Sequence, residues 1–316
     1  MVASSRFATM TNDSHYQKCI AWLTVFTIEA VAIVSMNAFT IIIYLKERIL
    51  RKRTTSLVIS LAVADMFVTY NLIFEILFLG NYMYCNFWKI NLYRSFEIYI
   101  VTSSLAYFFP AASLANLAAI SLERMHATFR PFKHRLIKKK IFGAAVAGVW
   151  FTAALSTAIV FSIFLPGRSD ITTFYHVQAL YYLFLFCCLF IMVVSYTSIA
   201  TKFYCGTHPQ RHGAIRRERK LTKTLFIVTI VSLILVMPFT IFWFLFHVTS
   251  GEMDETISYE TWQHLELSLR CLFYGNSFIN PLLYALKMPE FKRALFLLLR
   301  CRSRSEPVEV IPLNDI

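Results

Sequence analysis

Hydrophobic and polar positions follow one another along this chain in long blocks. Seven long apolar runs are separated by shorter polar segments, and they cover residues 20–45, 54–79, 93–126, 141–165, 176–204, 216–248 and 262–286. An α-helix rises 1.5 Å per residue, so about 20 apolar residues cross the roughly 30 Å hydrocarbon layer of a membrane. The pattern therefore predicts an all-α membrane protein built as a seven-transmembrane helix bundle.

An eighth segment has a different pattern and follows the last run. Residues 289–299 place apolar side chains on one helical face and basic ones on the other, and Pro289 suits the first position of a helix. The segment is too short and too charged to span, so we expect an amphipathic helix lying in the interface. The predicted organisation is an extracellular tail (1–19), the bundle (20–286), amphipathic helix 8 (287–300) and a cytoplasmic tail (301–316). Cys301 is a candidate for palmitoylation.

Composition supports a membrane protein and charge gives its orientation. Hydrophobic residues make up 57% of the chain and charged residues only 16%, which is too apolar for a soluble protein of this size. The net charge of +13 does not indicate nucleic acid, because 24 of the 31 Lys and Arg residues lie in segments 46–53, 130–140, 202–223 and 287–304. These alternate connections are cytosolic by the positive-inside rule.

The same rule places the N-terminus outside the cell, in a multi-pass protein of the plasma membrane. Asn12-Asp13-Ser14 is then an N-glycosylation acceptor on the correct side. The lipid bilayer is one expected partner, and nucleic acid is not expected.

Polar side chains inside the apolar runs are the candidate functional residues. Asp65, Ser113, Asn276 and Asn280 could surround a hydrated pocket for a proton or small cation, because buried acids and amides must face one another or water. A purely structural hydrogen-bonded patch is the alternative. Arg124 is costly in a membrane unless it is paired or functional; alternatively it extends toward the headgroups beside Glu123.

Taken together, the order and spacing of these motifs resemble those of a rhodopsin-like (class A) G protein-coupled receptor. The motifs are Asn37, Leu61-Ala62-Val63-Ala64-Asp65, Glu123-Arg124-Met125, Trp150, Tyr196, Pro238 and Asn280-Pro281-Leu282-Leu283-Tyr284. The resemblance implies a receptor that binds an extracellular ligand and activates heterotrimeric G proteins.

The resemblance also implies roles at the cytosolic side. Arg124 would pair with Glu123 and with Glu218, which lies twenty residues before Pro238. Activation would swing the sixth run outward about Pro238 and free Arg124 toward the G protein.

Further roles follow from the same resemblance. Tyr196 and Tyr284 would turn inward and hold the open state, and Pro131-Phe132 would contact the G protein. Asp65, Ser113, Asn276 and Asn280 would hold an allosteric sodium ion; no other cofactor is expected.

The chain departs from the family pattern at several positions. Tyr99 stands where most members have the disulfide cysteine of the third helix, and the loop 166–175 contains no cysteine. Cys19 and Cys85 are the remaining extracellular thiols, and they either pair with each other or stay free. Cys188, Val236 and Ser232 replace the usual Pro, Trp and Phe of helices five and six.

The ligand is less well defined. Ala106 replaces the Asp of amine receptors, and Tyr274 replaces the Lys that binds retinal. The expected ligand pocket contains Glu75, Tyr107, Phe239, Trp243, Glu266, Arg270 and Tyr274. Glu75 either pairs with Arg270 or binds a ligand cation. The ligand is a peptide, as in the similar melanocortin-type receptors, or a small molecule, with a lipid still open.

Two other functions compete with the receptor hypothesis. A seven-helix ion or proton carrier would use Asp65 and Glu75 as relay acids, but it would give the spacing between Arg124 and Glu218 no role. An intramembrane enzyme lacks support, because the chain has neither metal-binding motifs nor a nucleophile elbow. We therefore expect no enzymatic activity.

Overall fold

A computed structural model describes residues 2–46, 55–79, 96–162, 171–205, 213–249, 258–287 and 289–301. This part of the chain is helical, with no strand. Its helices are α1 (Val2–Lys46), α2 (Thr55–Phe78), α3 (Phe96–Phe129), α4 (Pro131–Leu136), α5 (Lys139–Phe161), α6 (Ile171–Cys205), α7 (Gly213–Val248), α8 (Tyr259–Lys287) and α9 (Pro289–Cys301).

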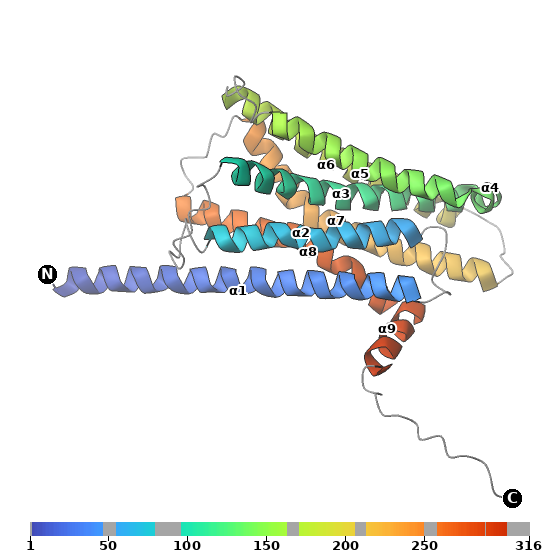
Figure 1. The fold of residues 1–316 in the computed structure, drawn as a ribbon, viewed down its shortest axis with the longest axis horizontal. Helices are drawn as coiled ribbons and strands as arrows, with labels where there is room; N and C mark the ends of the chain where they lie inside the picture. Colours follow the sequence, from blue (N-terminus) through green and yellow to red (C-terminus); the bar gives the residue numbers. More distant parts are fainter. Residues whose placement is uncertain are drawn as a thin grey trace, which may run out of the picture.

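Seven long helices close into a ring. Each of these helices contacts the next one in the order α1, α2, α3, α5, α6, α7 and α8. The ring is closed by contacts between α8 and α1. Figure 1 shows these helices side by side, with α9 turning away from the bundle near the end of α1. Residues 110–118 of α3 are buried without interruption, because α3 packs against α2, α5, α6 and α7. This central helix carries both Ser113 and Arg124.

Six of the described helices contain a stretch that is long and apolar enough to cross a membrane. These helices are α1, α2, α3, α5, α6 and α7. α8 completes the ring, although it carries more polar residues. The expected runs correspond to these helices, with end points that mostly differ by a few residues, as is usual for helix boundaries. The exception is α1, which begins at Val2 and therefore includes residues that were expected to form a tail before residue 20.

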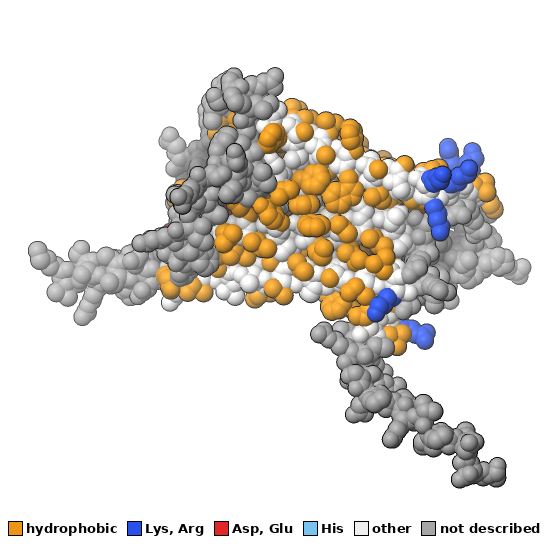
Figure 2. Space-filling model, in the orientation of Figure 1, with side chains coloured by type: hydrophobic (Ala, Val, Ile, Leu, Met, Phe, Trp, Pro, Cys, Tyr) orange, Lys and Arg blue, Asp and Glu red, His pale blue; other side chains and the backbone are white. Residues whose placement is uncertain are grey.

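Burial follows the helical period. Buried residues of α1 recur every three or four positions and are at most 8% exposed: Phe26, Ala30, Ile33, Asn37 and Thr40. Apolar side chains point outward between them, such as Ile28 and Val31, each about two-thirds exposed. Figure 2 shows a broad apolar band along the bundle. An apolar surface of this kind is suited to the hydrocarbon of a membrane. The backbone polar groups of each helix are then satisfied within the helix itself.

One end of the bundle carries most of the exposed basic side chains of the described residues, and we call it the basic end. Its members in the described residues include Lys46, Lys133, Lys138, Lys139, Lys140, Lys202, Lys292 and Arg293. They gather at one end of the apolar band (Figure 2). We call the other end of the bundle the opposite end.

The segment between α3 and α5 differs from the expectation of a basic loop. It contains α4, a helix that begins at Pro131. Proline fixes the backbone angle that a first helical turn needs and loses no hydrogen bond there. This six-residue helix lies at the same end of the bundle as the end of α3 (Figure 1).

Candidate functional site

Asp65 of α2 is the centre of a hydrogen-bonded group in the middle of the bundle. Its side chain is completely buried. Ser113 Oγ of α3 donates to Oδ1 at 2.5 Å, Ser277 Oγ of α8 donates to the same oxygen at 2.9 Å, and Asn280 Nδ2 donates to Oδ2 at 2.9 Å. The predicted residues Ser113 and Asn280 thus reach Asp65, and Ser277 is a third donor that the predicted set lacked.

A small cavity adjoins this group. Ser113, Asn276 and Ser277 line it together with apolar side chains that include Val236 and Phe273. It has room for about one water-sized particle. Asn276 Oδ1 and Asn280 Oδ1 are buried without a hydrogen-bond partner in the described part of the chain. Several oxygen atoms around a small cavity are the donors that a hard cation prefers.

Further polar contacts connect the helices around Asp65. Asn37 is 1% exposed, and its Nδ2 donates to the carbonyl oxygens of Ile33 (2.9 Å) and Ser277 (3.0 Å). Trp150 Nε1 of α5 donates to Ser60 Oγ of α2 at 3.0 Å. The bonds to Ser277 and to Ser60 each fix one helix against another, because a buried donor without an acceptor is costly.

Arg124 lies at the basic end of α3 and is 5% exposed. Its Nε lies 2.5 Å from Glu123 Oε2, and both side chains are buried. The other carboxylate oxygen, Oε1, lies 2.7 Å from His134 Nε2 of α4. The structure therefore brings Glu123 and Arg124 together, and it adds His134, which sequence reasoning missed.

The remaining predicted coupling residues belong to α4, α6, α7 and α8. Tyr196 of α6 and Tyr284 of α8 are 3% and 2% exposed, and the Tyr284 hydroxyl has no hydrogen-bond partner within the described residues. Phe132 of α4 is 81% exposed. Glu218 belongs to α7, but its side chain lies outside the described residues, so its pairing with Arg124 stays a prediction.

The predicted ligand residues lie toward the opposite end, where Arg270 of α8 joins two carboxylates. It forms ion pairs with Glu75 of α2 and with Glu266, whose Oε1 is 2.5 Å from Nη2. Its guanidinium also lies 5.8 Å from the centre of the Trp243 ring. Glu75 therefore pairs with Arg270, which settles the alternative that the sequence left open.

Aromatic side chains make up the rest of the predicted pocket. Phe239 and Phe273 are in ring contact with centroids 4.5 Å apart. Gln178 Nε2 donates to the Tyr107 hydroxyl at 2.9 Å. Gln178 Oε1 and Trp243 Nε1 are buried and lack hydrogen-bond partners among the described residues.

A comparison with known proteins identifies the family. The pattern described as 7 transmembrane receptor (rhodopsin family) matches residues 36–284. This match covers most of the chain and includes Asn37, Asp65, Arg124 and Tyr284.

The chain belongs to the rhodopsin family of seven-transmembrane receptors. The protein is a G protein-coupled receptor, and the carrier hypothesis is not favoured.

Individual relatives agree with this assignment. The receptor is 26% identical to the Substance-K receptor of Homo sapiens over 93% of this chain and 78% of that protein. It is 24% identical to a QRFP-like peptide receptor of Branchiostoma floridae over 87% of this chain and 77% of that protein. It is also 26% identical to the Octopamine receptor beta-1R of Drosophila melanogaster over 82% of this chain and 57% of that protein.

The receptor has a further intramembrane acid, which sequence reasoning missed. Glu29 of α1 accepts a hydrogen bond from the Cys271 thiol of α8. A Cβ atom on Gly275 would lie in ordinary van der Waals contact with Glu29 Oε1, at 3.5 Å, so this glycine of α8 lies beside the carboxyl group. An acid inside an apolar run is the signal that marked Asp65, and it also marks Glu29.

Cysteine pairing is resolved in part. Cys19 of α1 is disulfide-bonded and 4% exposed. Its predicted partner, Cys85, lies outside the described residues, so the pairing of these two cysteines stays a prediction. The candidate modification sites Asn12 and Cys301 belong to described helices, but their side chains are not described.

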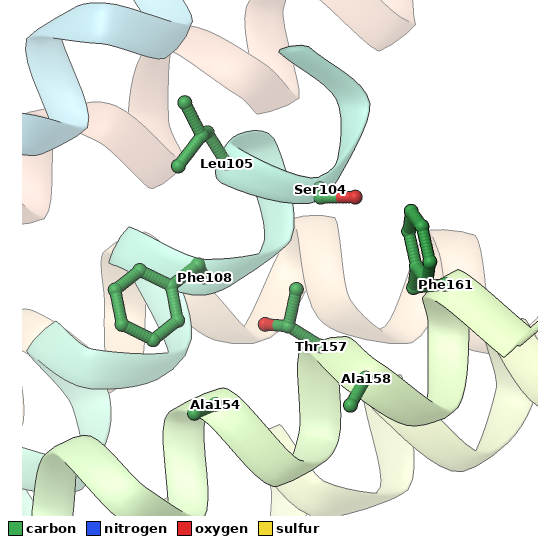
Figure 3. Close-up of a pocket in the computed structure, with 7 residues that line it drawn as sticks. All are labelled: Ser104, Leu105, Phe108, Ala154, Thr157, Ala158 and Phe161. Atoms are coloured by element: carbon green, nitrogen blue, oxygen red, sulfur yellow. The ribbon is translucent and has the colours of Figure 1, made fainter. Parts of the chain in front are cut away.

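A groove of about 380 Å³ lies between α3 and α5 of the receptor. Figure 3 shows Phe108 of α3 and Phe161 of α5 beside Ala154, Thr157 and Ala158. Its lining is almost entirely apolar, and Ala154 and Ala158 belong to the exposed surface of α5. The groove is therefore separate from the inward-facing residues of the predicted ligand pocket.

Proposed function

We propose that this receptor binds an extracellular peptide and activates a heterotrimeric G protein by releasing Arg124. The buried ion pair of Arg124 with Glu123 carries the proposal. A buried cation paired with an acid at the basic end is a group that a conformational change can expose to a partner. The basic end is cytosolic by the positive-inside rule, so the released Arg124 faces the G protein.

In this mechanism α7 moves outward about Pro238, which lies inside the helix. The movement separates Glu218 from Arg124 and opens the basic end between α3, α6 and α7. Tyr196 and Tyr284 then turn toward the opening. The Tyr284 hydroxyl supports this step, because it has no hydrogen-bond partner in the described part of this conformation and can gain one on activation.

A peptide is the ligand class best supported. Two of the relatives are named as receptors of peptides, the Substance-K and QRFP-like receptors. Octopamine is an amine, but Ala106 stands where amine receptors have an Asp, so this chain lacks that anchor. The buried and unpartnered Trp243 Nε1 and Gln178 Oε1 offer one donor and one acceptor for a peptide group. The peptide shifts the equilibrium only if it binds the active state more tightly.

We propose that a sodium ion binds in the resting state to four residues: Asp65, Ser113, Asn276 and Asn280. Asp65 has no cationic side chain within hydrogen-bond distance in the described residues, and the adjoining cavity is lined by side chains with oxygen donors. Sodium would supply the missing positive charge. Val236 also lines this cavity and belongs to α7, so the ion and the position of α7 are coupled.

The receptor is proposed to act in the plasma membrane with its N-terminus outside, and to catalyse no reaction of its own. The protein is a multi-pass membrane protein. The distribution of exposed lysines supports the orientation, since most of those in the described residues gather at the end where α1 finishes.

Guanine nucleotide exchange on purified G proteins, measured with membranes that contain the receptor, tests this function. Arg124→Ala should reduce receptor-dependent exchange by about tenfold, whereas Glu218→Ala should raise the basal rate because Arg124 loses one partner. Arg130→Ala is the matched control, because Arg130 is an exposed arginine just beyond α3 and should change little. Exchange that is absent with every G protein class, or unaffected by Arg124→Ala, would contradict the proposal.

A further inference from the structure

The groove between α3 and α5 lies near the membrane border at the opposite end of the bundle. Ser104 of α3 lies twenty residues before Arg124, and Phe161 of α5 lies twenty-one residues after Lys140. At 1.5 Å per residue each interval covers about 30 Å, which is the thickness of the hydrocarbon layer. Arg124 and Lys140 belong to the basic end, so Ser104 and Phe161 lie near the other border.

The open side of the groove faces lipid. Its floor contains Ala154 and Ala158, which are exposed on α5, and Phe161 beside them is 39% exposed. Because α5 is long and apolar enough to span, the membrane interior lies against these side chains. The groove continues into the apolar outer surface of α5, where Phe151 and Leu155 are also exposed. Its occupant therefore comes from the membrane and not from water.

The lining carries no charge. Of the seven described residues that line the groove, five are apolar, and Ser104 and Thr157 carry hydroxyl groups. Thr157 Oγ1 donates to the Ala153 carbonyl at 2.9 Å, and its oxygen keeps lone pairs that accept a hydrogen bond. A charged phospholipid headgroup has no ionic partner among these residues, whereas an uncharged lipid with a hydroxyl group has an acceptor.

The shape of the groove favours a rigid, flat molecule. Ala154 and Ala158 are four residues apart, so their methyl groups lie on the same helical face. Phe108 and Phe161 stand on either side of Thr157 (Figure 3). A fused ring system covers both methyl groups without losing internal freedom, whereas a flexible acyl chain loses rotational freedom at each bond that is held.

The wall that Phe108 forms is ordered before anything binds. Its ring contacts those of Phe109 and Trp150, with centroids 5.2 and 5.6 Å apart. Trp150 is itself fixed to α2, because its Nε1 donates to Ser60 Oγ. Binding therefore orders few further side chains, which favours affinity.

A second copy of the receptor is a poorer occupant than a lipid. A stable protein–protein interface takes about 20–30 residues from each partner. Seven residues line this groove. The groove is therefore matched to a small molecule of the bilayer.

We propose that the groove between α3 and α5 binds a membrane sterol, in the outer leaflet for the proposed orientation. The sterol hydroxyl group lies near the border and donates to Thr157 Oγ1, beside Ser104. Its fused rings run inward over Ala158 and then Ala154. The site does not depend on the proposed function, because its geometry and its lipid surroundings carry it.

The same turn of α3 connects the groove to the predicted ligand pocket. Tyr107 precedes Phe108 in the chain, and its hydroxyl accepts a hydrogen bond from Gln178 Nε2. Its carbonyl oxygen accepts a second one from the Tyr181 hydroxyl at 2.9 Å. A sterol that packs on Phe108 therefore acts on the segment of α3 that also contacts α6 inside the bundle.

Photolabelling tests the site. The full-length receptor is reconstituted in phosphatidylcholine vesicles with a cholesterol analogue that carries a diazirine on its rings, and labelled peptides are identified by mass spectrometry after irradiation. Label should concentrate in residues 104–108 and 154–161, and cholesterol should displace it, whereas added phosphatidylcholine should not. Ala158→Leu should reduce this label by at least about tenfold, because the larger side chain occupies the space of the rings.

Ala147→Leu is the matched control. It makes the same substitution at an exposed position of α5 outside the lining, and it should keep the label. Ala154→Leu fills the floor one turn deeper and should lower the label as Ala158→Leu does, so the result does not depend on one variant. Equal melting temperatures of the variants show that they have folded.

The outcomes are distinguishable. Label spread evenly over the outward faces of the helices, or groove label that Ala158→Leu leaves unchanged, would overturn the proposal. Stronger labelling of the same residues by phosphatidylcholine with a diazirine in its acyl chain would make an acyl chain the occupant. Receptor dimers that crosslink without sterol and are lost in Ala158→Leu would assign the groove to a second copy. Each of these results leaves the proposed function as it stands.

Discussion

At the scale of single residues, the polar positions in the apolar runs were predictable but their partners only in part. Asp65 and Asn280 could be placed together from sequence, because two buried polar groups in hydrocarbon have few other partners. Ser277 and His134 could not be placed. Serine is common in membrane helices, and the direction in which His134 points depends on α4, whose packing is a tertiary property.

The sodium proposal makes a prediction at this scale. The melting temperature of the purified receptor should be higher in sodium chloride than in choline chloride of equal ionic strength, because a bound ion stabilises the folded state. At about ten times the dissociation constant, the gain is on the order of 1.4 kcal/mol, or a few degrees. Asp65→Asn should abolish this difference.

Glu75→Gln provides the control for that measurement. It removes another intramembrane acid, one that already pairs with Arg270, and it should keep the sodium effect. A melting temperature that responds equally to both salts in the wild type would disprove the sodium site.

At the scale of elements, length and hydrophobicity predicted the spanning helices, while α4 was missed. A run of more than 20 apolar residues is a strong signal, since hydrocarbon admits few alternatives to a helix. A six-residue helix leaves no comparable periodicity, and only Pro131 marked its start. The same reason explains why the end points differ: helix ends depend on contacts that a hydropathy pattern does not contain.

The amphipathic helix α9 gives the prediction at this scale. Phe291 is 2% exposed and contacts the rings of Tyr44 in α1 and Tyr284 in α8, with centroids 5.9 and 6.2 Å apart. Phe291→Ala should lower the free energy of unfolding by about 3 kcal/mol, because it leaves a cavity where α9 meets the bundle.

Phe296→Ala is the matched control, since Phe296 lies on the same helix and is 55% exposed. Thermal unfolding in detergent measures both variants. Equal shifts for the two would contradict the docking of α9 through Phe291.

At the scale of the whole molecule, the sequence predicted two features. The apolar runs predicted the bundle of seven helices, and the positions of the basic residues predicted the side that carries the lysines. The strongly basic segments alternate with segments that carry few basic residues, and in the structure the described lysines and arginines of the basic segments lie at one end. The contacts across the ring, such as Arg270 with Glu75, were left as alternatives, because a sequence does not fix how each helix is rotated about its axis.

Orientation is the prediction at this scale. If the N-terminus is extracellular, the receptor should carry an N-linked glycan on Asn12, and treatment with a glycosidase should increase its mobility in gel electrophoresis. The shift should disappear in Asn12→Gln. An antibody tag at residue 1 should be accessible on intact cells; accessibility only after permeabilisation would reverse the orientation.

The contacts of Arg270 have a consequence for any search for the natural agonist. This guanidinium already satisfies two acids, Glu75 and Glu266, so the trio retains one negative charge. A carboxyl-bearing compound would have to compete with both for a single partner. Screening is therefore best started from peptides rich in lysine or arginine, whose side chains could neutralise the acid left over.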